Sequence, residues 1–386
     1  MLLRFTHHHT VDMESHVFQP IVDSLRRCIN AKLFPGAALA LVKKNGCIFQ
    51  AAVGKLEPTK TSNPTATDTI FDLASLTKPI ATATAILLLT DQKKLSLDQS
   101  IDTFIPTFKG LALGKATVIQ LLTHTSGLPA WKPLYLKGTG MASYLRTIAD
   151  LPLENTPGSC VNYSCLGYIV LTEIIQQVSG ITISDFTHRY IFTPLQMNMT
   201  CYNPPEKLKD LVAPTEFGNS HERDLSGNDG KHFDQWRDYR LRGEVHDGNA
   251  CGLGGVSGNA GLFSNVKDLS LFCQFMLSDT AHTRLFTETD WIKIAVQNHT
   301  PGLSDSRGLG WQMAASSSAV KNSLSDHAYG HCGFTGTSIW IDPLLETGVI
   351  LLTNRAYFGG DGRFFAEYRS VFHQITFSCL KVWESL

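Results

Sequence analysis

Residues 71–93 read FDLASLTKPIATATAILLLTDQK, and this stretch decides the fold. From Ser75 onward the segment is apolar on nearly every side, which is typical of a helix buried in a protein core. Pro79 falls within the first turn of that helix, where its missing N–H leaves no hydrogen bond unmade. The segment therefore predicts a long internal helix that begins beside Ser75.

Ser75 and Lys78 form a Ser-x-x-Lys tetrad at the start of this predicted helix. Side chains three residues apart share a helix face, so an unprotonated lysine could take the serine proton. A helix N-terminus also favours the negative charge that develops during attack. The spacing alone is weak, because three other serine–lysine pairs in the chain share it. A serine that only caps a helix is the alternative, and the local sequence leaves both interpretations open.

The composition favours a compact folded protein and excludes several classes of partner. The chain has 386 residues, of which 43% are hydrophobic and 17% charged, which is enough for two lobes and unlike a disordered chain. The formal net charge is −1 and no basic run with interleaved aromatic residues occurs, so we expect no nucleic-acid partner. No stretch approaches about 18 consecutive apolar residues, so we expect no membrane span.

The N-terminus and the cysteines bear on the compartment and on metal binding. The N-terminus lacks an apolar secretory region, which favours the cytoplasm, whereas a processed or atypically exported form would be periplasmic. Nine cysteines without CxxC spacing argue against a disulfide framework and a zinc site. His7, His8 and His9 are interpreted as part of a frayed polar terminus. The sequence predicts neither a metal nor a cofactor.

Strand patterns at both ends of the chain enclose a helical middle. Asn45-Gly46 between two apolar runs predicts a β-hairpin, and further strands are expected at 310–313, 337–343 and 348–355. Helices are expected near 15–33, 141–150, 165–179, 184–192, 267–278 and 364–384. We therefore predict an α+β fold. Its antiparallel β-sheet, flanked by helices, would be formed by residues 15–90 and 250–386, with an inserted, mainly helical lobe at 91–249.

Five blocks occur in an order that carries more information than any single tetrad. They are FDLASLTK (71–78), LLTHTSGLP (121–129), PGSCVNYSCLGY (157–168), HDGNACGLGGVSGNAGLFS (246–264) and GHCGFTGTSIWIDP (330–343). In this order the chain resembles the serine β-lactamase-like superfamily, in the branch of class C β-lactamases and low-molecular-weight penicillin-binding proteins (DD-peptidases), which is related to the β-lactamase-like esterases. The similarity covers roughly residues 17–375, and it implies the β-lactamase/transpeptidase-like fold.

The resemblance implies catalytic roles for four residues. Ser75 would be the acylated nucleophile and Lys78 its hydrogen-bonded partner. Tyr163 would be the second base, and because a free tyrosine has a pKa near ~10 it needs cationic neighbours, Lys78 and His331 among them. Without the neighbouring motif, Tyr163 could equally be a core tyrosine and His331 a surface histidine at a strand edge.

The same resemblance implies an oxyanion hole and shows two departures. The N–H groups of Ser75 and Phe334, beside Gly333, would bind the oxyanion. Cys165 stands where relatives carry an asparagine that bonds the lysine, and a thiol is a weak replacement, which puts efficient β-lactam turnover in doubt. His331 stands where many relatives carry lysine, which weakens the positive charge for a substrate carboxylate.

Several other residues are interpreted as structural. Cys165 and Cys332 border the same implied cleft and could form a disulfide if their Cα atoms lie within about 7 Å, with two unrelated thiols as the alternative. His124 and His246 are expected to brace loops. Trp311 and Trp340 are expected in the core, and the glycines of 248–264 in tight backbone packing under the site.

The function expected from the resemblance is acyl transfer to Ser75 followed by hydrolysis. A D-alanyl-D-alanine-type peptide is the first substrate class, with slow β-lactam hydrolysis beside it, and a carboxylic ester is the second. A non-catalytic descendant used for assembly or ligand binding is the alternative from another class. The small-molecule or peptide substrate is the only partner expected.

Overall fold

The computed structural model describes residues 16–278, 285–287, 290–320, 323–360 and 362–386. His7, His8, His9 and the predicted start of the first helix at residue 15 lie outside these residues. A six-stranded antiparallel sheet forms the centre, with the strand order β2-β1-β9-β8-β7-β6. Its strands are β1 Gly36–Lys43, β2 Gly46–Gly54, β6 Gln312–Met313, β7 Tyr329–Cys332, β8 Ser338–Asp342 and β9 Thr347–Thr353.

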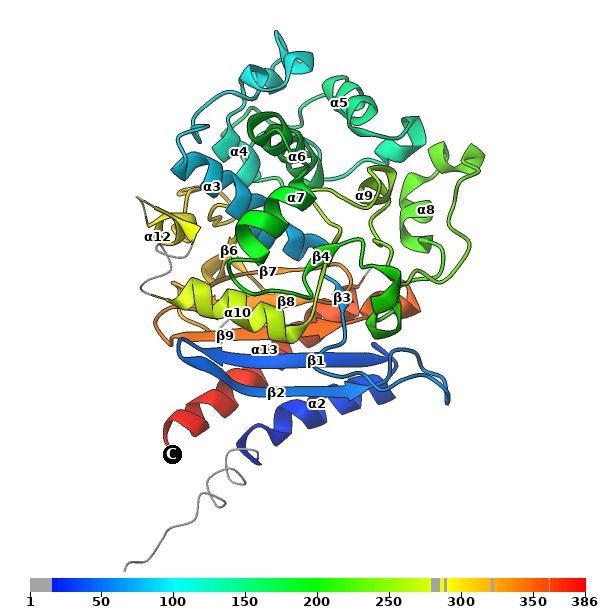
Figure 1. Ribbon diagram of the computed structural model, residues 1–386, viewed down its shortest axis with the longest axis vertical. Helices are drawn as coiled ribbons and strands as arrows, with labels where there is room; N and C mark the ends of the chain where they lie inside the picture. Colours follow the sequence, from blue (N-terminus) through cyan, green and yellow to red (C-terminus); the bar gives the residue numbers. More distant parts are fainter. Residues whose placement is uncertain (1–15, 279–284, 288–289, 321–322, 361) are drawn as a thin grey trace, which may run out of the picture.

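The central sheet joins the two ends of the chain. The predicted hairpin at Asn45-Gly46 links β1 to β2, with Gly36 opposite Gly54. On its other edge β1 pairs with β9, and in Figure 1 these blue and orange strands run side by side. Strands separated by some 300 residues of sequence therefore share one hydrogen-bonded ladder, with Ala37 opposite Thr353.

Side-chain alternation along β1 separates two cores. Leu39 and Leu41 belong to a buried cluster with residues of α2 (Gln19–Asn30) and α13 (Arg363–Glu384), which cover one face of the sheet. Ala38 and Ala40 belong to the larger cluster on the other face, where α10 (Val266–Leu277) packs on β1 and β9. Successive strand residues point to opposite faces, so one strand serves both cores.

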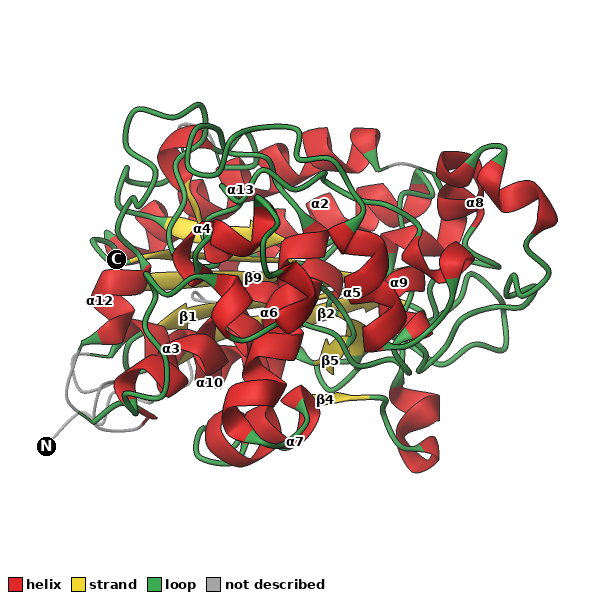
Figure 2. Ribbon diagram, turned by 90° about the horizontal axis from the view of Figure 1, so that it is seen from above, coloured by secondary structure: helices red, strands yellow, loops and turns green. Residues whose placement is uncertain are grey.

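Most other helices gather on one side of the sheet, above it in Figure 1 and facing the viewer in Figure 2. They are α3 Thr84–Asp91, α4 Val118–Leu122, α5 Met141–Ala149, α6 Cys165–Ser179, α7 Ile183–Thr187, α8 Ser220–Ser226, α9 Gly248–Gly252 and α12 Trp291–Ala295. The predicted α+β fold with its antiparallel sheet is confirmed. The division into 15–90 with 250–386 and an inserted 91–249 stays a prediction.

A second, three-stranded sheet in the order β3-β5-β4 leads into the predicted internal helix. Its strands are β3 Phe71–Asp72, β4 Cys201–Tyr202 and β5 Leu262–Ser264. The expectation of one regular helix from Ser75 onward was wrong. The chain instead makes a 3-10 turn at Ala74–Leu76, a π-helix (η2) at Lys78–Ala83 and then α3. Pro79 has no N–H to donate, which disfavours a regular α-helical ladder through this turn.

Among the described residues no single helix has both the length and the apolarity to cross a bilayer; one bent pair, Cys165–Ser179 with Ile183–Phe192, passes that test jointly by length and composition.

Candidate active site

Ser75 lies on the turn that follows β3, and hydrogen bonds hold this turn on both sides. Ala74 has φ +47°, in the left-handed region that side chains disfavour. Asp72 Oδ1 compensates by accepting the Ala74 N–H at 2.8 Å. From the connection after β7, the hydroxyls of Thr335 and Thr337 donate to the carbonyls of Asp72 and Leu73 at 2.7 and 2.9 Å. The turn that presents Ser75 is therefore anchored to the central sheet.

Lys78 is fully buried, and its Nζ has three neighbours. It donates to Ser75 Oγ at 3.0 Å, to the Asn259 carbonyl at 2.9 Å and to Cys165 Sγ at 3.5 Å. Burial disfavours the ammonium form, but the ionised forms of Cys165 and Tyr163 would attract it, and with a hydrogen bond to Tyr163 they raise the pKa of Lys78. The ammonium form of Lys78 is therefore favoured next to Ser75, whereas the tetrad alone suggested an unprotonated amine.

Tyr163 lies beside Ser75 and Lys78, although it comes from a distant segment of the sequence. Lys78 Nζ is 5.0 Å from the centre of its ring, and the Arg307 guanidinium is 5.5 Å from the same centre. Burial raises the pKa of Tyr163, while the charge of Lys78 and hydrogen bonds with Lys78 and Ser75 oppose that rise. The structure therefore brings Ser75, Lys78 and Tyr163 together, with cations next to the phenol ring.

His331 is also at this place, although it cannot supply the expected charge. Its ring is 5.8 Å from that of Tyr163, and its Nδ1 lies 2.9 Å from the Cys332 carbonyl oxygen. Burial and the positive charges of Lys78 and Arg307 hold the pKa of His331 well below its usual range. The expectation that His331 acts as a cationic neighbour was wrong, because a buried imidazole between two cations stays neutral.

Gly333 allows the end of β7 to approach the Ser75 turn. A Cβ at this position would meet Thr337 Oγ1 at 2.1 Å and the Leu73 carbonyl oxygen at 2.4 Å. Phe334 follows directly and, like Ser75, lines the cavities on both sides of the site. Only glycine fits between the two backbones, so the N–H groups of Ser75 and Phe334 are carried by segments in direct contact.

The two cysteines face different cavities. Cys165 contacts Lys78, and burial raises the pKa of its thiol. Cys332 lines the cavity on the other side of Ser75, and both thiols are free in the structure. The disulfide between them stays a prediction.

Three arginines that the motifs did not indicate line a cavity next to Ser75. We call it the arginine cavity; it is lined by Ser75, Tyr163, Arg307, His331, Cys332, Gly333, Arg355 and Arg369, among others, and has a volume of about 390 Å³. The part of its lining that the structure describes contains no Asp or Glu. Arg307 forms an ion pair with Asp305, Arg355 donates to the Phe334 carbonyl at 2.7 Å, and Arg369 donates to the Gly333 carbonyl at 3.1 Å. In this cavity the positively charged side chains are thus arginines, of which Arg307 is already paired with Asp305.

A central cavity lies on the other side of Ser75. Its lining includes Ser75, Tyr163 and Cys165 together with Trp131, Glu222, Leu225, His246 and Asp247. Its lining combines apolar side chains with the carboxylates Glu222 and Asp247, and the charge of Asp247 reaches Lys78 and Cys165. Ser75 therefore lines both a cavity with three arginines and a cavity with two carboxylates.

The expected structural roles are confirmed for the histidines and the tryptophans. His124 Nδ1 accepts the Ser164 N–H at 3.0 Å, and His246 Nε2 lies 2.8 Å from Glu216 Oε2. Trp311 and Trp340 are buried. Gly258 packs so closely that an added Cβ would lie 2.5 Å from the Tyr168 carbonyl oxygen, as expected of the glycine-rich block. In the described part of the chain no group of three or more His, Cys, Asp or Glu residues is arranged to hold a metal ion.

Comparison with known proteins shows the family and the fold of the chain. The profile of the Beta-lactamase family matches residues 22–370. N-acetylmuramyl-L-alanine amidase of Bacillus subtilis (strain 168) is 34% identical over 84% of this chain and 78% of its own length. A putative D-alanyl-D-alanine carboxypeptidase of Salmonella enteritidis PT4 (strain P125109) is 31% identical over 84% of this chain and 79% of its own.

A solved structure has the same fold at lower identity. EstCE1, described as a hydrolase with promiscuous acyltransferase activity, superposes with a TM-score of 0.71 at 21% identity, covering 94% of this chain and 99% of its own. This likeness bears on the fold alone.

Proposed function

The chain belongs to the β-lactamase family, and within it we propose that this protein is a serine hydrolase that forms an acyl-enzyme on Ser75. The observation that carries the proposal is the 3.0 Å hydrogen bond from Lys78 Nζ to Ser75 Oγ, at a point where two cavities meet. A nucleophile needs a group that can take its proton, here Tyr163 beside the Lys78 ammonium, and a space for the substrate, here the two cavities.

The proposed acylation uses Lys78 and Tyr163 as a unit. Ser75 Oγ attacks the substrate carbonyl carbon, and its proton passes to the Tyr163 phenol oxygen in its ionised form, which the Lys78 ammonium stabilises. The N–H groups of Ser75 and Phe334 stabilise the oxyanion. The proton then moves to the leaving amine or alcohol, the tetrahedral intermediate collapses, and water hydrolyses the acyl-enzyme by the same steps in reverse order.

A substrate with a carboxylate on its leaving group fits the arginine cavity best. Arg307, Arg355 and Arg369 surround a space into which that group would extend from Ser75, and arginine forks match carboxylate geometry. We therefore rank a D-alanyl-D-alanine-type peptide first, as a carboxypeptidase substrate, with a β-lactam as a slow analogue. The relative described as a putative D-alanyl-D-alanine carboxypeptidase supports this ranking.

A carboxylic ester is the second candidate, because the central cavity next to Ser75 offers apolar Trp131, Leu225 and Phe334 to an acyl group. A simple ester would leave the arginine cavity without an anion. Comparing p-nitrophenyl butyrate with an acyl-D-Ala-D-Ala peptide therefore separates the two candidates, and the higher kcat/KM identifies the favoured class.

The nucleophile is tested by intact-mass analysis after incubation with a fluorescent penicillin. We expect one penicilloyl adduct on the wild-type protein and none on Ser75→Ala. Ser378→Ala is the matched control, because Ser378 and Lys381 have the same spacing but lie on α13, where the Ser378 hydroxyl donates to the Gln374 carbonyl. An adduct that persists in Ser75→Ala, or activity of that variant equal to wild type, would overturn the proposal in favour of another nucleophile or a non-catalytic role.

The arginine cavity is tested with a peptide and its C-terminal amide. Amidation removes the carboxylate, and we expect kcat/KM to fall about 10- to 100-fold, the size expected for one charge-assisted pair. In Arg307→Gln the ratio of the rates for acid and amide should fall, whereas Arg26→Gln should keep that ratio, since Arg26 is an exposed residue that pairs with Asp23. Equal rates for acid and amide in the wild-type protein would exclude this mode of binding.

A further inference from the structure

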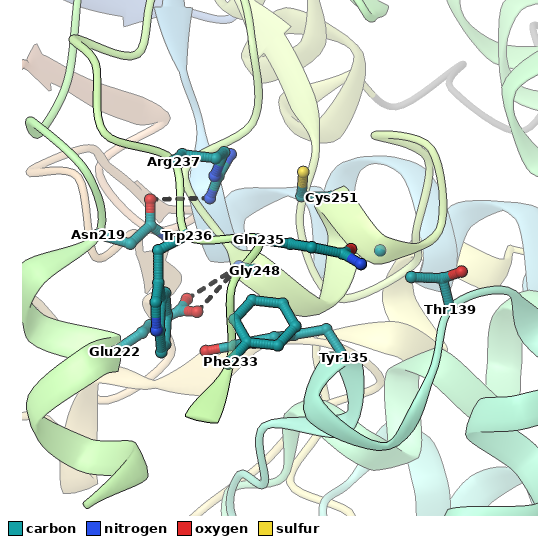
Figure 3. A pocket seen from close by; sticks show the side chains of 11 residues that line it. Tyr135, Thr139, Asn219, Glu222, Phe233, Gln235, Trp236, Arg237, Gly248 and Cys251 are labelled. Carbon is teal, nitrogen blue, oxygen red and sulfur yellow. Dashed lines mark hydrogen bonds between the residues drawn. The ribbon is translucent and has the colours of Figure 1, made fainter. Parts of the chain in front are cut away.

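An aromatic pocket opens beyond the central cavity. Its wall contains the rings of Tyr135, Phe233 and Trp236, which meet mostly edge to face: Phe233 and Trp236 have centroids 5.1 Å apart at 82°, and Tyr135 and Trp236 have centroids 5.9 Å apart at 78°. Figure 3 shows these side chains with Glu222 and Arg237 around the same space. The Arg223 guanidinium already lies 5.0 Å from the centre of the Trp236 ring. The three rings together provide apolar surface and negative ring faces that favour a cation.

A carboxylate lies within this aromatic wall. Glu222 is 6% exposed, and its two oxygens accept the Gly248 N–H at 2.9 and 3.2 Å. In the part of the chain that the structure describes, neither Glu222 nor neighbouring Asp247 belongs to an ion pair. Burying a carboxylate outside an ion pair is costly; the charge of His246 offsets part of that cost, and a bound cation would offset more of it.

The nearby arginine does not neutralise Glu222. The Nη1 of Arg237 donates to Glu244 Oε1 and the Val245 carbonyl at 2.8 and 2.6 Å. Its Nη2 donates to Asn219 Oδ1 and the His246 carbonyl at 2.8 and 2.7 Å. Both terminal nitrogens of Arg237 are therefore used within the protein, and its charge is balanced by Glu244.

The aromatic pocket and the central cavity share one lining residue. Glu222 lines both the aromatic pocket and the central cavity, and the central cavity also contains Ser75. The arginine cavity lies on the other side of Ser75. A substrate across Ser75 thus has its leaving group among arginines and its acyl part directed to Glu222 and the rings.

We propose that the aromatic pocket binds an ammonium group carried by the acyl part of the substrate, with Glu222 as its counter-ion and Trp236, Phe233 and Tyr135 around it. Aromatic rings with a carboxylate are the surroundings that favour an ammonium over a neutral chain. The proposal rests on Ser75 being the acylated residue, because that assigns the acyl part to this side. It goes further by naming the charge that the acyl part carries.

The test compares two peptides that differ in one charge. Nα-acetyl-L-lysyl-D-Ala-D-Ala has a side-chain ammonium, whereas Nα-acetyl-L-norleucyl-D-Ala-D-Ala has a similar chain without it. Their dissociation constants are measured by calorimetry on Ser75→Ala protein, which avoids turnover, and their kcat/KM values on wild type. We expect the lysyl peptide to be favoured at least about tenfold in both measurements.

Variants connect that preference to the pocket. Glu222→Gln, made in the wild type and in Ser75→Ala, should bring the lysyl-to-norleucyl ratio of kcat/KM and of affinity to about one. A general loss of activity affects both peptides equally and therefore leaves this ratio unchanged. Trp236→Leu keeps the carboxylate and should reduce the preference several-fold. Glu206→Gln is the control, since Glu206 is an exposed glutamate that pairs with Lys209, and it should keep the preference.

The measurements are made at about pH 8, where Glu222 is ionised. Burial and the charge of Asp247 raise the pKa of Glu222 to about 7, while His246, the Gly248 N–H and Tyr135 oppose the rise. Arg237 also lines the pocket. Because the raised pKa belongs to an acid, the carboxylate and the preference should be lost as the pH falls below about 7.

The outcomes separate the two proposals. Turnover of both peptides at equal rates, or a preference for norleucine, would keep the acyl-enzyme on Ser75 and overturn the ammonium site in favour of an apolar slot. Tighter binding of the lysyl peptide without turnover of either peptide would support the ammonium site at Glu222. It would overturn the proposal that the protein is a carboxypeptidase. Binding of neither peptide would overturn both.

Discussion

At the scale of single residues, the protonation states of Lys78 and Tyr163 decide which group can accept a proton from Ser75. The pKa of each is raised above its ordinary value, so at neutral pH the pair holds both protons. His331 and His124, the imidazoles beside them, have lowered pKa values and stay neutral there. In the proposed mechanism, the group that accepts the Ser75 proton therefore comes from the lysine–tyrosine pair and not from a histidine.

A pH dependence of acylation follows from this pair. A raised pKa means that the base form appears only as the pH rises, so the acylation rate should increase from about pH 7 to pH 9, by up to about tenfold per pH unit. Stopped-flow acylation by nitrocefin measures it. A plateau above an inflection near ~6.5, the ordinary pKa of histidine, would contradict this account and indicate a histidine base.

At Cys165, the hydrogen bond between its thiol and Lys78 should affect the rate of nitrocefin hydrolysis. Its thiol meets the Lys78 ammonium at 3.5 Å, where an amide oxygen would accept a stronger hydrogen bond. Cys165→Asn should therefore raise nitrocefin hydrolysis about 3- to 10-fold, the size of one improved hydrogen bond. Cys160→Asn, in the segment that precedes α6, is the control and should leave the rate within about twofold. A loss of activity in Cys165→Asn would show that the thiol is required.

At the scale of elements, the site depends on the contact between the turn after β3 and the end of β7. Neither segment is long: β3 has two residues and β7 has four. Their relative position is set by the hydroxyls of Thr335 and Thr337 and by the close fit of Gly333 against the Leu73 carbonyl. This contact places Ser75 beside Phe334.

Gly333→Ala tests that contact. The new Cβ would overlap backbone and Thr337, so we expect a loss of about 1–3 kcal/mol in the free energy of unfolding and at least about tenfold slower acylation. Gly167→Ala in α6 is the control, because its Cβ would come no closer than 3.4 Å to the Leu121 side chain. Denaturant titration and nitrocefin kinetics measure both. An unchanged acylation rate in Gly333→Ala would show that the close contact at Gly333 is not needed for acylation of Ser75.

At the scale of the whole molecule, one hydrophobic core links the sheet with the helices above it. The larger buried cluster contains Ala38 and Ala40 of β1, Ile350 of β9, and Leu121 and Ile169 of α4 and α6. Because the sheet and the helices bury apolar surface against each other, unfolding of the helices would expose apolar surface of the sheet and destabilise it.

Unfolding should therefore be cooperative. We expect a single thermal transition, with tryptophan fluorescence and far-ultraviolet circular dichroism changing together. Ile169→Ala in α6 should shift that one transition to lower temperature without splitting it. Two resolved transitions, one of them unaffected by the substitution, would show that the helical lobe folds separately.

The sequence by itself determined the local elements and the family. Alternating apolar residues with Asn45-Gly46 predict the β1–β2 hairpin because strand periodicity and turn chemistry are local. The helices α5, α6, α10 and α13 lie within a residue or two of the predicted ranges for the same reason. Ser75, Lys78 and Tyr163 were selected by ordered motifs.

Only the tertiary structure decided the charges around Ser75. Arg307, Arg355 and Arg369 meet at one cavity from separate segments, and no local pattern relates them. His331 is kept neutral because the fold buries it beside Lys78 and Arg307, and Arg237, which lines the pocket with Glu222, forms its ion pair with Glu244 instead. Charge state depends on burial and on neighbours distant in sequence, which are properties of the folded chain and not of any stretch of it.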